Sequence, residues 1–151
     1  MIARLFRRYP NPRGLLLLLA GYFLLQWLLR VVLGGGYEMD EAEQLILGQR
    51  LQLGYSPDPP LYTWLQIPLL RLFGEGVVAL SLLKNLLLFG LYACSWFVAR
   101  HAGLGRDQAA LAALSLLLLP GIGWESQRDL THTVLVTTLA AATLWAALAL
   151  L

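Results

Sequence analysis

Long runs of apolar residues are the feature that most restricts how this chain can fold. Four of them occur within 151 residues, at 14–33, 77–99, 108–124 and 133–151. A helix that crosses a bilayer needs about 20 apolar residues, so each run is close to the length of one span. Only 13% of the residues are charged, against about 25% in soluble domains. The sequence therefore predicts an all-α, polytopic membrane protein with about four transmembrane helices.

Arginines next to the apolar runs indicate how the chain is oriented. They stand before the first run and between the second and third runs: Arg4, Arg7, Arg8, Arg13, Arg100 and Arg106. The two places lie on one side of the membrane, which the positive-inside rule makes the cytoplasm. We expect a multi-pass protein of a cell membrane, typically the bacterial cytoplasmic membrane, with a cytoplasmic N-terminus. The loop 34–76 and the segment 125–132 then lie outside and contain most of the carboxylates.

The outer loop 34–76 is expected to begin with a glycine break and a short helix. Gly34-Gly35-Gly36 ends the first span, and residues 40–53 are predicted to be helical. Asp40, with Glu43 three residues later, has the spacing of a capping box at a helix N-terminus. Asp40 therefore has a structural interpretation, as a helix cap, beside any chemical role.

A second helix is predicted in the rest of this loop. Asp58-Pro59-Pro60 is typical of a cap followed by a proline in the first helical turn. Apolar residues then recur at helical spacing, and Tyr62 and Trp64 favour the membrane–water boundary. We expect an amphipathic helix that lies along the membrane surface.

Charged residues inside the first two runs need partners. Arg30, near the far end of the first run, is expected to extend to the interface. Lys84 and Asn85 interrupt the second run, where a charge is costly and usually faces the interior of a bundle. Lys84 is expected either to pair with an acid of the outer loop or to contact a phosphate.

The segment before the fourth run contains a second candidate group. Asp129 and His132 are three residues apart and would share one face of a helix. With a further acid they could hold a divalent metal ion. Capping of the fourth span by Asp129 or Thr131 is the alternative.

Short motifs in the outer segments also resemble a known family. They are Asp40-Glu41-Ala42-Glu43, Leu53-Gly54-Tyr55, Pro59-Pro60-Leu61-Tyr62-Thr63-Trp64-Leu65 and Asp129-Leu130-Thr131-His132-Thr133-Val134-Leu135. In order and spacing they resemble the family-39-like membrane glycosyltransferases, which include protein mannosyltransferases and the bacterial enzyme that adds aminoarabinose to lipid A. The resemblance extends from the first run to the fourth and so covers nearly the whole chain.

The resemblance implies a GT-C type fold and the transfer of a hexose or pentose from a polyprenyl-phosphate sugar donor. The acceptor would be a lipid, glycan or protein at the outer face of the membrane, and nucleic acid is not an expected partner. Asp40 would be the catalytic carboxylate that takes the proton of the acceptor. Asp129 matches the second-loop acid of the family, near which a divalent metal ion sometimes binds.

One position departs from the family pattern. The family often has a lysine immediately before the proline pair, where it could neutralise the lipid phosphate. Here that position is Asp58, preceded by Pro57, and a carboxylate repels a phosphate. We therefore expect the phosphate to be contacted by Arg50, Lys84 or Arg128.

The fourth apolar run is still apolar at Leu151, where the chain stops. We expect residues 1–151 to be the N-terminal part of one membrane-embedded glycosyltransferase domain, incomplete by itself. The alternative is a non-catalytic accessory protein or truncated remnant of such an enzyme. A transporter is disfavoured, because transport sites lie near the middle of the membrane and the acids here lie in loops.

Overall fold

The computed structural model describes residues 12–55 and 58–150, and this part of the chain is helical with no strand. Three of its helices are long and apolar enough to cross a membrane: α2 (Pro12–Leu33), α5 (Val77–His101) and α8 (His132–Ala149). They match three of the predicted spans to within a few residues. The prediction of an all-α, polytopic membrane protein is therefore confirmed. Arg4, Arg7, Arg8, Pro57 and Leu151, which entered the sequence predictions, lie outside the described residues.

The predicted third span is broken rather than straight. α6 (Arg106–Ser115) continues into the short helix η1 (Leu116–Leu118), and η2 (Gly121–Glu125) and α7 (Ser126–Arg128) follow at an angle of 77°. Pro120 lies at the break, where it cannot donate a backbone hydrogen bond. A Cβ atom on Gly123 would collide with the backbone carbonyl of Leu117, so a glycine is required there. The chain reaches a fourth crossing only if both halves count as one span.

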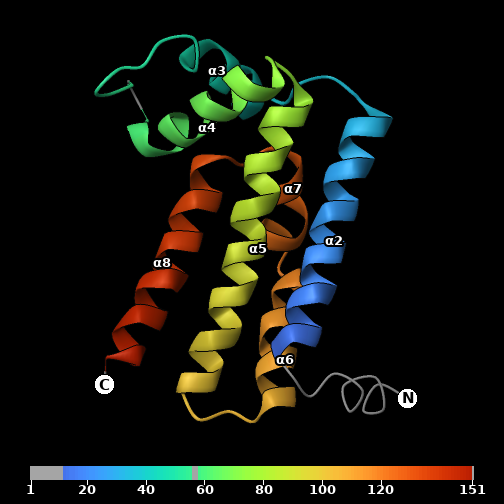
Figure 1. The fold of residues 1–151 in the computed structure, drawn as a ribbon, viewed down its shortest axis with the longest axis vertical. Coiled ribbons are helices and arrows are strands. Elements are labelled where there is room, and N and C mark those ends of the chain that lie inside the picture. The colour runs from blue at the N-terminus through green and yellow to red at the C-terminus, as the bar shows by residue number, and fades with distance from the viewer. Residues whose placement is uncertain (1–11, 56–57, 151) are drawn as a thin grey trace.

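α5 occupies the centre of the bundle. Figure 1 shows it between α8 and α2, with α6 beside its lower half. The main core cluster joins these four helices, and among its buried members are Leu19, Phe23, Leu88, Tyr92, Ala109, Ala113 and Val134. Small residues such as Ala109 and Ala113 let helices in a membrane approach closely. The polar residues Ser81, Lys84 and Asn85 of α5 are buried among the other helices.

α3 (Met39–Leu47) and α4 (Pro60–Phe73) lie across the end of the bundle at which α2 ends and α5 begins (Figure 1). The prediction of a helix over 40–53 was too long, because the chain leaves the helix at Gly48. The prediction of Asp40 as its cap was wrong. The N-cap is Glu38, whose backbone N–H donates to Glu41 Oε2 at 3.4 Å. Asp40 lies inside the first turn instead.

α4 is the predicted second helix of the outer loop. The prediction of Asp58 as its cap was wrong, because the N-cap is the next residue, Pro59. The face toward the bundle buries polar and apolar side chains: Tyr62, Thr63, Gln66, Ile67 and Leu70. The opposite face exposes large apolar side chains: Leu61, Trp64, Leu65, Leu72 and Phe73. An apolar face turned away from the protein suits a helix at a membrane surface.

Candidate active site

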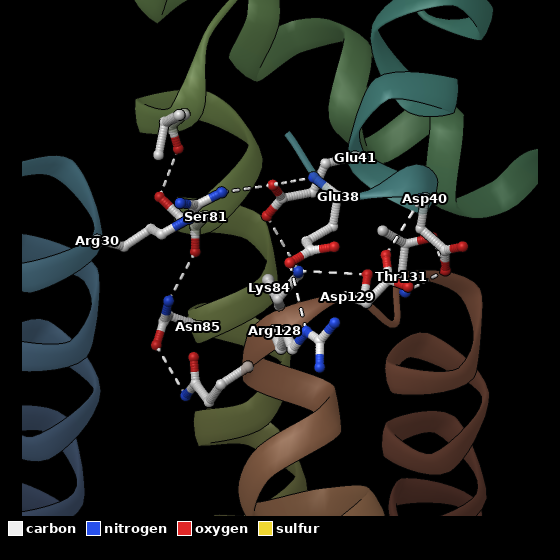
Figure 2. A network of polar contacts seen from close by, with 12 residues as sticks. Arg30, Glu38, Asp40, Glu41, Ser81, Lys84, Asn85, Arg128, Asp129 and Thr131 are labelled. Atoms are coloured by element: carbon white, nitrogen blue, oxygen red, sulfur yellow. Dashed lines mark hydrogen bonds and ion pairs between the residues drawn. The ribbon is translucent and has the colours of Figure 1, made fainter. Parts of the chain in front are cut away.

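A buried group of three charges joins three helices at the outer-loop end of the bundle. Glu41 on α3 is 1% exposed. Its Oε2 lies 2.7 Å from Arg30 Nη2 at the end of α2, and its Oε1 lies 3.2 Å from Lys84 Nζ on α5. Figure 2 shows Glu41 between the two cations. We call Arg30, Glu41 and Lys84 the ionic triad. It contains two positive charges and one negative charge.

The ionic triad shows which partner Lys84 has in the structure. Lys84 pairs with an acid of the outer loop, as one interpretation expected. Arg30 does not extend away from the protein, because its guanidinium also donates to the carbonyl oxygens of Gly34 and Gly36, at 2.9 and 3.1 Å. These hydrogen bonds fold residues 34–36 back over the end of α2. A buried charge needs such partners, since an unpaired one is strongly destabilising.

Asp40 and Asp129 are 89 residues apart in the sequence and lie next to each other in the fold. The backbone N–H of Asp40 donates to Asp129 Oδ1 at 3.1 Å. The backbone N–H and the hydroxyl of Thr131 donate to Asp40 Oδ2, at 3.2 and 3.4 Å. Thr131 is the N-cap residue of α8, and the N-terminus of a helix favours a nearby negative charge. The half-buried carboxylate of Asp40 is therefore held at the start of α8.

The ionic triad and the aspartate pair are connected. Lys84 Nζ also donates to the backbone carbonyl of Asp129, at 3.4 Å. At the rim, Arg128 Nε lies 3.3 Å from Glu38 Oε1, and both side chains are largely exposed. The first outer loop and the segment between α7 and α8 thus meet over α5, as Figure 2 shows.

His132 belongs to a separate group of contacts. Its Nε2 lies 2.9 Å from Gln44 Nε2 and 3.7 Å from Asp58 Oδ2. The hydroxyl of Thr63 donates to Gln44 Oε1 at 3.0 Å. An amide nitrogen can only donate, so in this arrangement His132 Nε2 is the acceptor. The prediction that Asp129 and His132 share a helix face was wrong, because α7 ends at Arg128 and α8 begins at His132.

The aspartates and His132 do not form a metal centre of the expected kind. In residues 12–55 and 58–150 there is no group of three or more His, Cys, Asp or Glu side chains placed to hold a metal ion. Asp129 turns to Asp40, whereas His132 turns to Gln44 and Asp58. A divalent metal ion stays a prediction, and no catalytic step is derived from one.

The cations predicted to contact a phosphate occupy three different environments. Lys84 is buried in the ionic triad, and Arg128 is at the exposed rim. Arg50 follows α3, and its side chain is exposed. The backbone carbonyl of Arg50 accepts a hydrogen bond from the hydroxyl of Tyr55, at 2.6 Å. Arg30 was not among the predicted cations, although it lies nearer to Glu41 than Lys84 does.

Tyr62 is a polar residue of the site that the sequence did not reveal. It is fully buried, and within the described residues its hydroxyl has no hydrogen-bond partner. Its ring packs against the ring of His132, with centroids 5.2 Å apart. Burial, together with the carboxylates of Glu41 and Asp40, raises the pKa of Tyr62 above its ordinary value. The sequence placed Tyr62 in the motif after the proline pair and at the membrane–water boundary. Its full burial corrects the second expectation, which only Trp64 fits.

The fold and these contacts define a class: a polytopic helical membrane protein with a cluster of paired charges at one end of its bundle. Comparison with known proteins is more specific. The lipopolysaccharide core galacturonosyltransferase RgtB of Rhizobium johnstonii is 44% identical over 119 residues, which are 79% of this chain and 24% of that protein. RgtA of the same organism, with the same description, is 42% identical over 117 residues, which are 78% and 23%. No family model and no solved structure matches the chain.

The chain therefore spans about a quarter of the length of these curated relatives. The similarity supports a glycosyltransferase family. The similarity agrees with the sequence resemblance in pointing to a glycosyltransferase. It does not test membership of the narrower GT-C, family-39-like group. The names of the relatives describe transfer of galacturonic acid to the lipopolysaccharide core by those proteins.

Proposed function

We propose that this chain is part of a membrane glycosyltransferase of the GT-C type. In this proposal it transfers a sugar from a polyprenyl-phosphate donor to an acceptor at the outer face of the cytoplasmic membrane. The observation that carries the proposal is the half-buried carboxylate of Asp40, held at the N-terminus of α8 beside Asp129. The relatives make galacturonic acid the first sugar to test and a lipopolysaccharide core the first acceptor.

Asp40 would act as the general base. Both hydrogen bonds from Thr131 reach Oδ2, which leaves Oδ1 to accept the proton of the acceptor hydroxyl. As that proton leaves, the hydroxyl oxygen attacks the anomeric carbon of the sugar, and the bond from this carbon to the phosphate oxygen breaks. The donors from Thr131 and the N-terminus of α8 fix the carboxylate in place and compensate its charge.

The leaving group is a lipid phosphate, which needs positive charge more than it needs a proton. The ionic triad supplies that charge, because Glu41 neutralises only one of its two cations. Glu41 directly follows Asp40 on α3, so the base and the excess positive charge are positioned by the same turn of helix. This arrangement supports a site where a proton is accepted on one side and a phosphate departs on the other.

The test is sugar transfer by the native gene product in its own membranes, with Asp40→Asn compared with wild type. Asparagine keeps the size and an acceptor oxygen for Thr131 but cannot take a proton. We expect transfer to fall by about 10²–10⁴-fold, the usual contribution of a general base. Glu43→Gln is the matched control, since it removes a carboxylate three residues away on the same helix.

Two results would count against the proposal. Undiminished transfer by Asp40→Asn would remove Asp40 from the chemistry. If the wild-type protein transfers no sugar from any polyprenyl-phosphate donor, the accessory or remnant interpretation replaces the enzyme.

A further inference from the structure

Two adjoining cavities lie between α2 and α5, and they differ sharply in character. The inner cavity has a volume of about 220 Å³ and is walled mainly by Phe23, Leu24, Trp27, Leu82, Leu86 and Phe89. The outer cavity has a volume of about 280 Å³, and its polar wall contains Gln26, Arg30, Ser81, Lys84, Asn85 and Gln127. Asn85 lines both. Together they form one groove, the α2–α5 groove, with an apolar half and a polar half.

The polar half of the groove is suited to an anion. It is lined by two cations, Arg30 and Lys84, and by no carboxylate. Their shared partner Glu41 does not line it. The Arg30 side chain is 24% exposed and that of Lys84 is 2% exposed, so Arg30 is the more accessible cation. The side-chain amides of Asn85 and Gln127 meet there at 3.3 Å. A phosphate with several oxygen acceptors matches such a set of donors.

The apolar half is suited to a hydrocarbon chain. Its α2 wall extends from Ala20 to Trp27, which is about 10 Å along a helix. Trp27 is fixed as part of this wall, because its indole N–H donates to the backbone carbonyl of Val78 at 3.1 Å. Leu24 and Leu86 are both more than half exposed, so the groove opens toward the surroundings of the bundle. A chain could enter it sideways from the bilayer.

We propose that the α2–α5 groove binds the lipid donor, with its phosphate at Arg30 and Lys84 and the first part of its chain along Trp27 and Leu86. This inference rests on the proposed function and deepens it. The occupant is a lipid with one chain on one phosphate, because the apolar cavity and the cationic cavity adjoin at Asn85. Asp40 is on the same turn of α3 as Glu41, and in Figure 2 it lies on the other side of Glu41 from Arg30.

The experiment is photolabelling of the native protein in nanodiscs with farnesyl phosphate that carries a diazirine on its chain. Labelled peptides are mapped by mass spectrometry. We expect labels at the apolar wall, at Leu24 or Trp27 on α2 and at Leu82, Leu86 or Phe89 on α5. Farnesol with the same diazirine lacks the phosphate and should label these residues about tenfold less, as expected when charge-assisted hydrogen bonds are lost.

Leu86→Trp is the blocking variant, because a larger side chain at the mouth fills the apolar half. Val136→Trp is its matched control, an exposed apolar position on α8 on the other side of α5. Labelling at the groove should fall in Leu86→Trp and be unchanged in Val136→Trp. Size-exclusion profiles in detergent show whether both variants fold.

This site would be overturned by equal labelling by farnesol, by labels spread evenly over the exposed faces of α2 and α8, or by an undiminished label in Leu86→Trp. A groove covered by another span gives no label and overturns it as well. The proposed function survives these results if Asp40→Asn still abolishes transfer. Conversely, phosphate-dependent labelling in a protein without transferase activity supports the site and removes the proposed function.

Discussion

Two neighbouring carboxylates on α3 have opposite environments. Glu41 is 1% exposed and held by two cations, one on each of its oxygens. Asp40 is half-buried, and within residues 12–55 and 58–150 its carboxylate is held through one oxygen by Thr131. A fully compensated buried acid serves to fix helices against one another, whereas a partly free acid at a surface can exchange a proton. The comparison therefore favours a structural role for Glu41, and it is the reason why Asp40 is the proposed base.

The largest effect is expected from Glu41→Gln, which leaves Arg30 and Lys84 without their counter-charge. Removing one partner of a buried ion pair costs about 3–5 kcal/mol of unfolding free energy. Unfolding in mixed micelles would measure it. The double variant Glu41→Gln with Lys84→Met removes the stranded lysine and should regain a large part of the loss. A cost below about 1 kcal/mol would mean that the ionic triad does not fix the helices.

Asp40→Asn should have the reverse profile, with a small cost in stability and a large one in activity. The asparagine oxygen can still accept from Thr131, so the unfolding free energy should change by about 1 kcal/mol or less. The same unfolding assay, run beside the transferase assay, separates the two effects. A stability loss as large as that of Glu41→Gln would erase the distinction between the two carboxylates.

Tyr62→Phe removes a buried hydroxyl that has no hydrogen-bond partner in the described residues. At neutral pH the unfolding free energy should be unchanged or higher by up to about 1 kcal/mol, because a buried group without a partner is removed. The raised pKa of Tyr62 keeps it protonated when folded, while the unfolded residue ionises near its ordinary value of 10.0. Wild type should therefore lose stability as pH rises above about 10, and Tyr62→Phe should lose less. A marked loss of stability in Tyr62→Phe at neutral pH would instead reveal a hidden partner.

The smallest effect is expected from Arg128→Gln. Its pair with Glu38 is largely exposed, and such pairs are worth about 1 kcal/mol or less and weaken with salt. Unfolding at low and high salt would check this. A cost that does not depend on salt would place Arg128 with the buried cations of the ionic triad.

The long elements were predictable from the sequence, and the contacts between them were only partly so. Runs of apolar residues locate α2, α5 and α8 because hydrophobic length alone decides a span. The cap of α3 was misplaced by two residues, since both Glu38 and Asp40 stand three before another acid and local spacing cannot choose between them. Lys84 was recognised as needing a partner. Its choice of Glu41, 43 residues away, depends on how α3 packs over α5, which no local pattern encodes.

The broken third span has a mechanical consequence for the membrane around it. α6 and η1 together cover 106–118, which is about 20 Å of helix, whereas the hydrocarbon core of a bilayer is about 30 Å thick. Lipids beside this helix have to thin or tilt to meet it, at a cost of fractions of a kcal/mol per Å. The protein thereby becomes sensitive to the chain length of its host lipids. The broken span also makes the hydrocarbon layer between the two aqueous phases thinner on the side of the protein where α6 lies.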